Sequence, residues 1–99
     1  MSAASLDIHH TEDDGRGAFY VERGGARIAE MTYSRTTPTL VIIDHTEVSP
    51  TLKGQGAGRQ LLDALVAWAR QTSTKVAATC PFALAQFQKD PSLGDVLDR

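Results

Sequence analysis

Apolar and polar residues alternate in short segments through the N-terminal half of the chain, a pattern that predicts β-strands. The predicted strands are Leu6–His10, Ala18–Arg23, Ala26–Tyr33 and Leu40–Ile43. Gly24-Gly25 separates the second strand from the third, and two glycines can adopt the positive φ angles of a two-residue hairpin turn. The polar stretch Thr11–Gly17 predicts a turn or an exposed loop. The continuous apolar run of the fourth strand is typical of a strand covered on both faces.

The period of the pattern becomes helical from about Leu52 to Thr72. One broad apolar stripe runs along this segment and consists of Leu61, Leu62, Leu65, Val66, Trp68 and Ala69. A short strand, Lys75–Cys80, and a short helix, Phe82–Lys89, are predicted to follow. Pro91 fits the first turn of a last helical segment, with Asp90 as its N-cap. The order β-β-β-β-α-β-α-α predicts an α+β fold, and 99 residues fit a single domain spanning 1–99.

The most informative segment is the glycine-rich turn Lys53–Arg59, which lies between the last N-terminal strand and the long helix. Gly54, Gly56 and Gly58 lack β-carbons, so a phosphate group can approach the backbone closely. The N–H groups at a helix start have no intrahelical acceptors and carry a partial positive charge, which favours phosphate oxygens. The turn therefore predicts a diphosphate site, to which the two flanking basic side chains add charge.

The same glycines also have a structural interpretation, because they permit a tight loop and close helix packing. Their spacing fits neither the P-loop, in which Gly is followed after four residues by Gly-Lys-Ser/Thr, nor the dinucleotide fingerprint G-x-G-x-x-G. Both of those nucleotide-binding folds are therefore disfavoured. The residues alone leave the diphosphate and the packing interpretations open.

The turn resembles the phosphate-binding motif of the GNAT N-acetyltransferases, which is Arg or Gln, two residues, Gly, one residue, and Gly or Ala. Lys53-Gly54-Gln55-Gly56-Ala57-Gly58 has that spacing, with Lys53 in place of the usual first Arg or Gln. A closer resemblance, from about Leu40 to Leu97, is to small single-domain GNAT-like proteins. It is carried by three short motifs: His45-Thr46-Glu47-Val48, Cys80-Pro81-Phe82 and Asp95-Val96-Leu97.

This resemblance implies a minimal GNAT fold, in which a mixed, mostly antiparallel sheet is combined with one long cofactor-binding helix and short C-terminal helices. It also implies that acetyl-coenzyme A (acetyl-CoA) lies in a cleft where two strands splay, and that its acetyl group is transferred to an amine that the sequence does not identify. The backbone near Val48 would pair with the pantetheine arm. The residues implied to bind the cofactor are Val48, Lys53, Gly54, Gln55, Gly56, Ala57, Gly58 and Arg59.

Three residues are candidates for the chemistry of acetyl transfer, which needs a base for the amine, a stabiliser of the thioester oxygen and a proton for the leaving thiolate. His45 and Glu47 share one face by strand alternation, and either can take the amine proton. Cys80 ends the strand after the long helix and can act as a nucleophile or a proton donor. Their structural alternatives are a hydrogen-bonded histidine, a solvated carboxylate and a small buried apolar residue.

Composition narrows the class of protein. Ten basic and twelve acidic residues are well mixed, with a net charge of −2, so the positive field of a nucleic-acid-binding protein is missing. No apolar run is long enough for a membrane span, and we expect a soluble, cytoplasmic protein. A lone cysteine excludes an internal disulfide and a cysteine-based zinc cluster. No metal site is expected, and His9-His10 is interpreted as a solvated pair, since adjacent strand residues point to opposite faces.

Three functional hypotheses follow. The first is an acetyl-CoA-dependent N-acetyltransferase. The second is a noncatalytic acyl-CoA-binding or sensor domain, because full GNAT enzymes usually have further N-terminal helices and C-terminal strands that build the acceptor site. The third is a purely structural interaction domain, which predicts no saturable binding of acetyl-CoA. The sequence carries no specific dimer signal, and a monomer or weak homodimer is expected.

Overall fold

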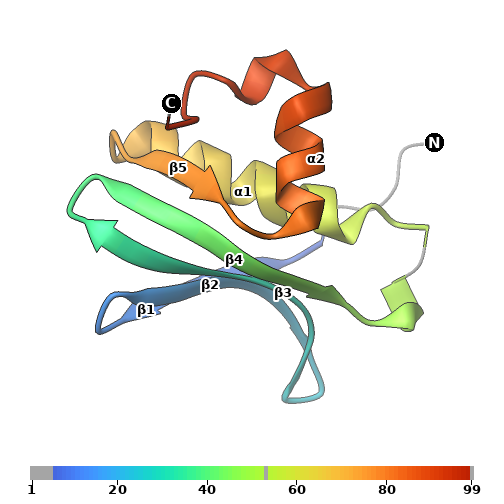
Figure 1. The fold of residues 1–99 in the computed structure, drawn as a ribbon. Coiled ribbons are helices and arrows are strands. Elements are labelled where there is room, and N and C mark those ends of the chain that lie inside the picture. Colours follow the sequence, from blue (N-terminus) through green and yellow to red (C-terminus); the bar gives the residue numbers. More distant parts are fainter. Residues whose placement is uncertain (1–5, 53, 99) are drawn as a thin grey trace.

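The computed structural model describes residues 6–52 and 54–98, which form one five-stranded sheet with its helices on one face (Figure 1). The strands lie in the order of the sequence, and their bounds are Ile8–Asp13 (β1), Arg16–Arg23 (β2), Ala26–Thr37 (β3), Leu40–Val48 (β4) and Lys75–Ala78 (β5). Neighbours from β1 to β4 pair antiparallel, whereas β5 pairs parallel to β4. The predicted mixed, mostly antiparallel α+β fold is confirmed.

Two of the three hairpin turns contain glycines with positive φ angles. Gly24 and Gly25 have φ angles of 62° and 82°, so the predicted two-residue turn between β2 and β3 is confirmed. The turn or loop predicted at 11–17 is a turn and is shorter than predicted, because β1 continues to Asp13 and only Asp14 and Gly15 form it. β1 is an edge strand that is largely exposed, and exposed polar side chains do not prevent its backbone from pairing with β2.

The long helix, Ala57–Gln71 (α1), packs its predicted apolar stripe on the sheet. Five residues of the stripe are fully buried: Leu61, Leu62, Leu65, Val66 and Ala69. The helical pattern that begins near Leu52 is interrupted, since Pro50–Leu52 is a 3₁₀ turn (η1) and the glycine turn separates it from α1. The second helix, Pro81–Lys89 (α2), is followed only by the 3₁₀ turn Pro91–Leu93 (η2), so the last predicted helix is a single turn.

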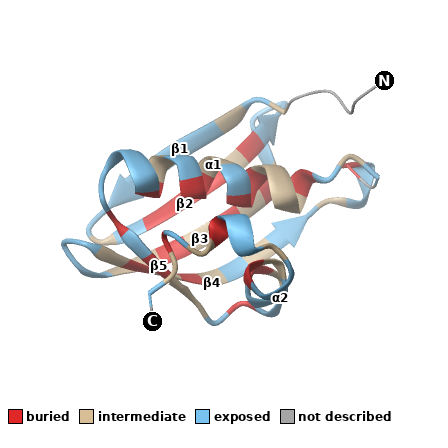
Figure 2. Cartoon of the chain, turned by 90° about the horizontal axis from the view of Figure 1, so that it is seen from above, coloured by how far each residue is buried: buried red, intermediate tan, exposed pale blue. Residues whose placement is uncertain are grey.

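Most of the buried residues lie on the face of the sheet that the helices cover, which Figure 2 shows from above. In β4, Val41 and Ile43 are completely buried beneath the helices, whereas Leu40 and Ile42 keep intermediate exposure on the other face. The prediction that this strand is covered on both faces is therefore wrong. No described element packs over the second face, and the neighbouring strands alone shield those two side chains.

A hydrogen-bonded group of side chains connects β1 to β3 across the intervening β2. The buried Tyr33 donates its hydroxyl to Glu12 Oε1 at 2.7 Å. Arg35 donates from Nε and Nη2 to the same carboxylate at 2.7 and 2.9 Å. Gly17 of β2 lies between them, and a Cβ there would be 2.3 Å from Tyr33 Cζ. The missing side chain lets the phenol cross β2 and reach Glu12.

His10 joins this group through its ring, and the residue remains exposed on the edge strand β1. Its Nε2 lies 2.7 Å from the Tyr33 hydroxyl, and its ring stacks on Phe19 with centroids 4.0 Å apart. Trp68 of α1 completes the aromatic cluster, so its predicted packing role is confirmed. Because the phenol proton goes to Glu12, the imidazole must donate from Nε2 to the phenol oxygen.

Acidification is expected to destabilise this protein through the same group. The hydrogen bond from Arg35, followed by that from Tyr33, lowers the pKa of Glu12 from 4.5 to about 2, and burial lowers the pKa of His10. A depressed folded-state pKa means that stability is present above the ordinary value and is lost as pH falls through the folded value. Below about pH 6.5, we expect the free energy of unfolding, measured in urea, to decrease because His10 becomes protonated more readily in the unfolded chain. Between about pH 4.5 and 2, it should decrease further because of Glu12.

The variant Glu12→Gln separates the two contributions, since it lacks the carboxylate but keeps the histidine. The stability difference between wild type and Glu12→Gln should be largest near neutral pH and should disappear as the pH approaches about 2. A difference that stays constant over this range would contradict the assigned role of Glu12.

Candidate functional site

Strands β4 and β5 separate halfway along β4. They pair only over Leu40–Ile43 and Lys75–Ala78, after which β4 continues to Val48 and the other chain turns into α2 (Figure 1). The N–H groups of Thr79 and Cys80 both donate to Ile43 O, at 2.9 and 3.3 Å, which closes the paired region. Beyond Ile43, no described strand pairs with this edge of β4.

The free edge of β4 exposes backbone hydrogen-bonding groups. The N–H of Ser49 donates to Ile28 O of β3 at 2.7 Å, so Ser49 directs its N–H toward the sheet. Successive residues of a strand direct these groups to opposite edges. The N–H and C=O groups of Val48 and Thr46 therefore face the free edge, where an extended ligand can pair with them.

A bulge in β4 sets which side chains flank this edge. Tyr33 pairs with Ile43 and Thr32 with His45, so Asp44 is an extra residue in the ladder. Thr32 and Ser34 donate their hydroxyls to the Asp44 carboxylate, which fixes the bulge on the open face. After the bulge, the alternation of side chains between the two faces of the sheet is shifted by one residue. For this reason His45 and Glu47 lie on the face away from the helices.

The structure brings His45 and Glu47 together. His45 Nε2 lies 3.6 Å from Glu47 Oε1, and both side chains are exposed, by 57% and 73%. Glu30 of β3 lies directly opposite Glu47, and one ligand atom from each of the three side chains lies within 4.8 Å of the others. An imidazole and two carboxylates in this arrangement can accept protons or hold a positively charged group.

Cys80 lies on the opposite side of β4 from these residues. It is only 4% exposed and occupies the N-cap position of α2, and its Sγ is 3.2 Å from Thr46 Oγ1. Because Thr46 points to the helix side, Cys80 makes no direct contact with His45 or Glu47. The three candidate residues therefore flank the free edge from its two faces and do not form one cluster.

The glycine turn has the open geometry expected of a phosphate site. Gly54 and Gly56 have φ angles of 82° and 66°, and a Cβ at either position would meet no described atom within 4 Å. Gly56 is the N-cap of α1 and provides no side-chain cap, so the first N–H groups of the helix, from Ala57 onward, face the turn without an intrahelical acceptor. Gln60 braces the turn by donating from Nε2 to Gln55 O at 3.0 Å.

Two residues of the turn are placed differently from the prediction. A Cβ on Gly58 would lie 2.8 Å from Phe82 Cζ, so the missing side chain of this glycine permits close packing of α2, and only its backbone can serve a phosphate. The Arg59 guanidinium donates to Asp63, Gln86 and Asp90. The hydrogen bond to Asp63, followed by that to Asp90, raises the pKa of Arg59. Only the backbone of Arg59 faces the turn. Lys53 lies outside the described residues.

Sequence reasoning missed Glu30 and Thr46 as parts of this site. Glu30 lies at the site because it is paired with Glu47, and that register depends on bulges in both strands. The predicted strand 26–33 does not alternate cleanly between apolar and polar residues, so no sequence signal indicated which residue Glu30 would face. Thr46 was named only as part of a motif, and its contact with Cys80 is tertiary.

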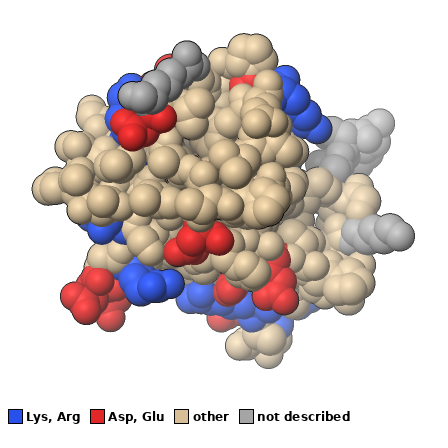
Figure 3. Space-filling view, in the orientation of Figure 1, with Lys and Arg blue, Asp and Glu red and all other residues tan. Residues whose placement is uncertain are grey.

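Charged side chains are interspersed on the surface seen in Figure 3, where acidic and basic groups lie beside one another and form no broad patch of one sign. Within the described residues, no helix combines the length and apolarity that crossing a bilayer requires. The mixed charges on this surface agree with the mixed acidic and basic composition of the chain.

Comparison with known proteins places this geometry in a family. Residues 18–96 match the family described as GCN5-related N-acetyl-transferase. A GCN5-like N-acetyltransferase candidate from Staphylococcus aureus, solved by NMR, is 35% identical, with a TM-score of 0.72; 96% of this chain and 90% of that chain are covered. The comparison with curated proteins gave no match.

Larger enzymes share the fold at lower identity. The ribosomal-protein-alanine N-acetyltransferase of Brucella melitensis biovar Abortus 2308 is 21% identical, with a TM-score of 0.58 over 71% of this chain and 53% of that one. A GNAT family acetyltransferase from Elizabethkingia anophelis, solved with acetyl-CoA bound, is 18% identical, with a TM-score of 0.58 over 76% and 52%. This chain thus spans about half the length of those enzymes and nearly all of the small S. aureus protein. By sequence and by fold, the chain belongs to the GCN5-related N-acetyltransferase (GNAT) family.

Proposed function

We propose that residues 1–99 act as one acetyltransferase domain that transfers the acetyl group of acetyl-CoA to an amine. One observation carries the proposal: an open turn with positive φ angles at Gly54 and Gly56 lies next to the free edge of β4. The turn supplies N–H donors for a diphosphate, and the strand edge supplies partners for an amide-containing chain. The E. anophelis protein, which has the same fold, was solved with acetyl-CoA bound, and this supports the choice of ligand.

The binding residues follow from the two features. The backbone of residues 54–59, together with Lys53, holds the pyrophosphate at the N-terminus of α1. Val48 and Thr46 pair with the pantetheine arm through their backbone groups. This places the thioester between the His45 and Glu47 side chains on one face of the strand and Cys80 on the other. When bound, acetyl-CoA supplies the activated acetyl group.

The side chains of the chain divide the proton transfers between the two faces of β4. On the open face, the His45–Glu47 pair takes the proton of the ammonium and releases a nucleophilic amine. The amine nitrogen forms a bond to the acetyl carbon while the bond from that carbon to sulfur breaks. On the core face, the Cys80 thiol lies 3.2 Å from Thr46 Oγ1 and has one of two roles. In direct transfer it gives its proton to the leaving coenzyme A thiolate, and the second proton of the amine nitrogen then restores the thiol. As a nucleophile, its Sγ instead bonds to the acetyl carbon while coenzyme A leaves as the thiol, and the amine then takes the acetyl group from Cys80 and releases the cysteine thiol.

A noncatalytic acyl-CoA sensor is the second candidate. The similarity to the larger enzymes covers about half of each of them, so it supports the cofactor-binding part of the proposal more directly than acetyl transfer. Such a sensor would bind acetyl-CoA through the same turn and would have no use for the His45–Glu47 pair.

Calorimetry with acetyl-CoA, followed by mass spectrometry, tests the proposed function. Saturable one-to-one binding is expected, and an acetyl group should appear on one or more members of a panel of amines. Tight binding with no acetylated amine would favour the sensor, whereas no binding would contradict both candidates. An acetyl group on Cys80 would identify this residue as a nucleophile, and its absence during turnover would identify direct transfer.

A further inference from the structure

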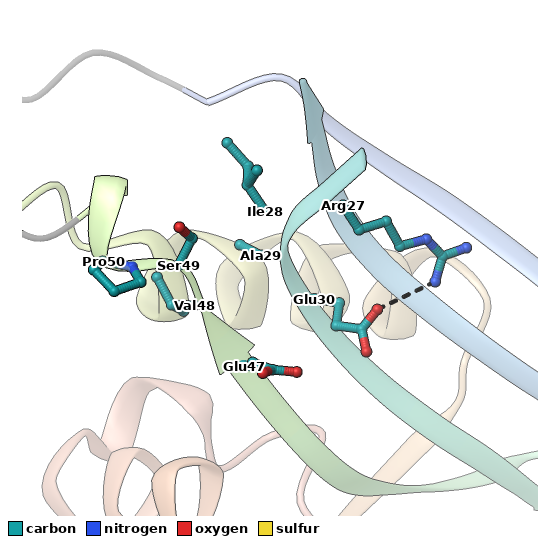
Figure 4. A pocket seen from close by; sticks show the side chains of 8 residues that line it. All are labelled: Arg27, Ile28, Ala29, Glu30, Glu47, Val48, Ser49 and Pro50. Atoms are coloured by element: carbon teal, nitrogen blue, oxygen red, sulfur yellow. Dashed lines mark hydrogen bonds and ion pairs between the residues drawn. The ribbon is translucent and has the colours of Figure 1, made fainter. Parts of the chain in front are cut away.

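A small pocket lies on the open face where β3 begins and β4 ends, beside η1 (Figure 4). Its volume is about 240 Å³, and its charged lining consists of Arg27, Glu30 and Glu47. Ile28, Val48 and Pro50 contribute apolar atoms to its wall. The pocket thus adjoins both the proposed base pair and the strand edge proposed for pantetheine, so a ligand in it lies beside the proposed thioester position.

Two carboxylates face each other in this pocket without an adequate counter-ion. Glu30 and Glu47 are direct cross-strand partners, and like charges in this arrangement are destabilising. Arg27 reaches only Glu30, with Nη1 to Oε1 at 3.4 Å. The partner of Glu47 among the described residues is His45, at 3.6 Å. A positively charged group between the two carboxylates relieves their repulsion.

The Arg27 guanidinium is oriented by Tyr20 and has donors that can bind an anionic group. Its Cζ lies 4.0 Å above the Tyr20 ring, a cation–π contact that orients the planar guanidinium. The bulge at Ile28 returns Arg27 to the same face as Glu30, as the dashed contact in Figure 4 shows. One long contact uses a single donor of the five on a guanidinium, so the others can bind a carboxylate.

We propose that the acceptor is a free α-amino acid with a small, uncharged side chain. Its ammonium lies between Glu30 and Glu47, next to His45, and its carboxylate binds Arg27. The mixed charge of the pocket decides the class of acceptor. Arg27 repels a ligand with a second positive charge, and the two carboxylates repel a ligand with two negative charges. A volume below the roughly 300 Å³ of pockets for drug-sized ligands selects a small molecule. This assignment rests on the proposed function, whose acceptor it names.

Matched ligands that differ only in the carboxylate test the assignment. L-alanine and L-valine are compared with L-alaninamide and L-valinamide by NMR titration of the ¹⁵N-labelled protein, with and without acetyl-CoA, and by initial rates. The acids should bind about tenfold or more tightly than the amides, since a charge-assisted hydrogen bond is lost with the carboxylate. Equal or weaker binding of the acids, or no binding of any of the four, overturns the proposal.

Two arginine variants separate the pocket from general charge effects. Arg27→Gln should abolish the preference for the acids, whereas Arg23→Gln, on β2 and outside the pocket, should retain it. A preference that survives Arg27→Gln also overturns the proposal. Calorimetry with acetyl-CoA on the same proteins keeps the two proposals apart. Acetyl-CoA binding without an acid preference refutes only the acceptor assignment, and an acid preference without acetyl-CoA binding refutes only the proposed function.

Discussion

Replacing Gly56 by leucine is expected to lower the affinity for acetyl-CoA about 100-fold or more, a loss of about 2.7 kcal/mol in binding free energy. Gly56 has a φ angle of 66° and precedes the first N–H groups of α1. A side chain at this position covers the donors proposed for the pyrophosphate, and it also favours a backbone conformation that turns them away. Calorimetric titration of the purified variant measures the effect.

Gly24→Leu is a closely matched control. Gly24 has a φ angle of 62°, and a Cβ there also meets no described atom within 4 Å, but the residue lies in the hairpin between β2 and β3. The free energy of unfolding should decrease by a similar amount in both variants, about 1–2 kcal/mol, because a non-glycine residue is strained in the left-handed region. Only Gly56→Leu should lose affinity for acetyl-CoA. Unchanged affinity in a folded Gly56→Leu protein would refute the proposed phosphate site.

Removing either member of the His45–Glu47 pair should reduce kcat by about 10² to 10⁴ while leaving the affinity for acetyl-CoA unchanged. The two variants are His45→Gln and Glu47→Gln. One of them removes the base that takes the proton of the ammonium, and the other removes the partner of that base. Because residues that act as a unit are not additive, the double variant should be little worse than the more damaged single variant. Initial rates with saturating acetyl-CoA measure these losses.

Glu22→Gln is the control for this series, because Glu22 is an exposed carboxylate on β2 that lies outside the pocket beside β4. It should retain the wild-type rate. Single variants that keep more than about half of the activity would show that neither residue is the base. Losses that multiply in the double variant would show two independent roles instead of one pair.

Local sequence patterns predicted most of the elements of this fold. The Gly24-Gly25 turn, the apolar stripe of α1 and the strands on either side of the glycine turn were all recognisable, because each depends on a period or on the backbone preference of one residue type. The ends of the elements were less accurate. β1 and β4 extend through polar residues, whose side chains are simply exposed on paired strands.

The sequence named candidate residues and predicted that His45 and Glu47 share one face of a strand, but it did not give their surroundings. The bulge at Asp44 turns that face away from the helices, and Cys80 lies on the other side of β4. The three glycines of the turn looked equivalent in the sequence. Only the packing of Phe82 distinguishes Gly58 from Gly54 and Gly56.

The sequence by itself determined the family, the order of elements and the chemical character of the turn, because these depend on residue type and short-range spacing. Only the tertiary structure decided that one face of the sheet stays open, that Glu30 meets Glu47, and that Arg59 binds α2 and η2 rather than facing the turn. These contacts join residues far apart in the chain. They depend on strand register and helix packing, and a shift of one residue in either would change which side chains meet.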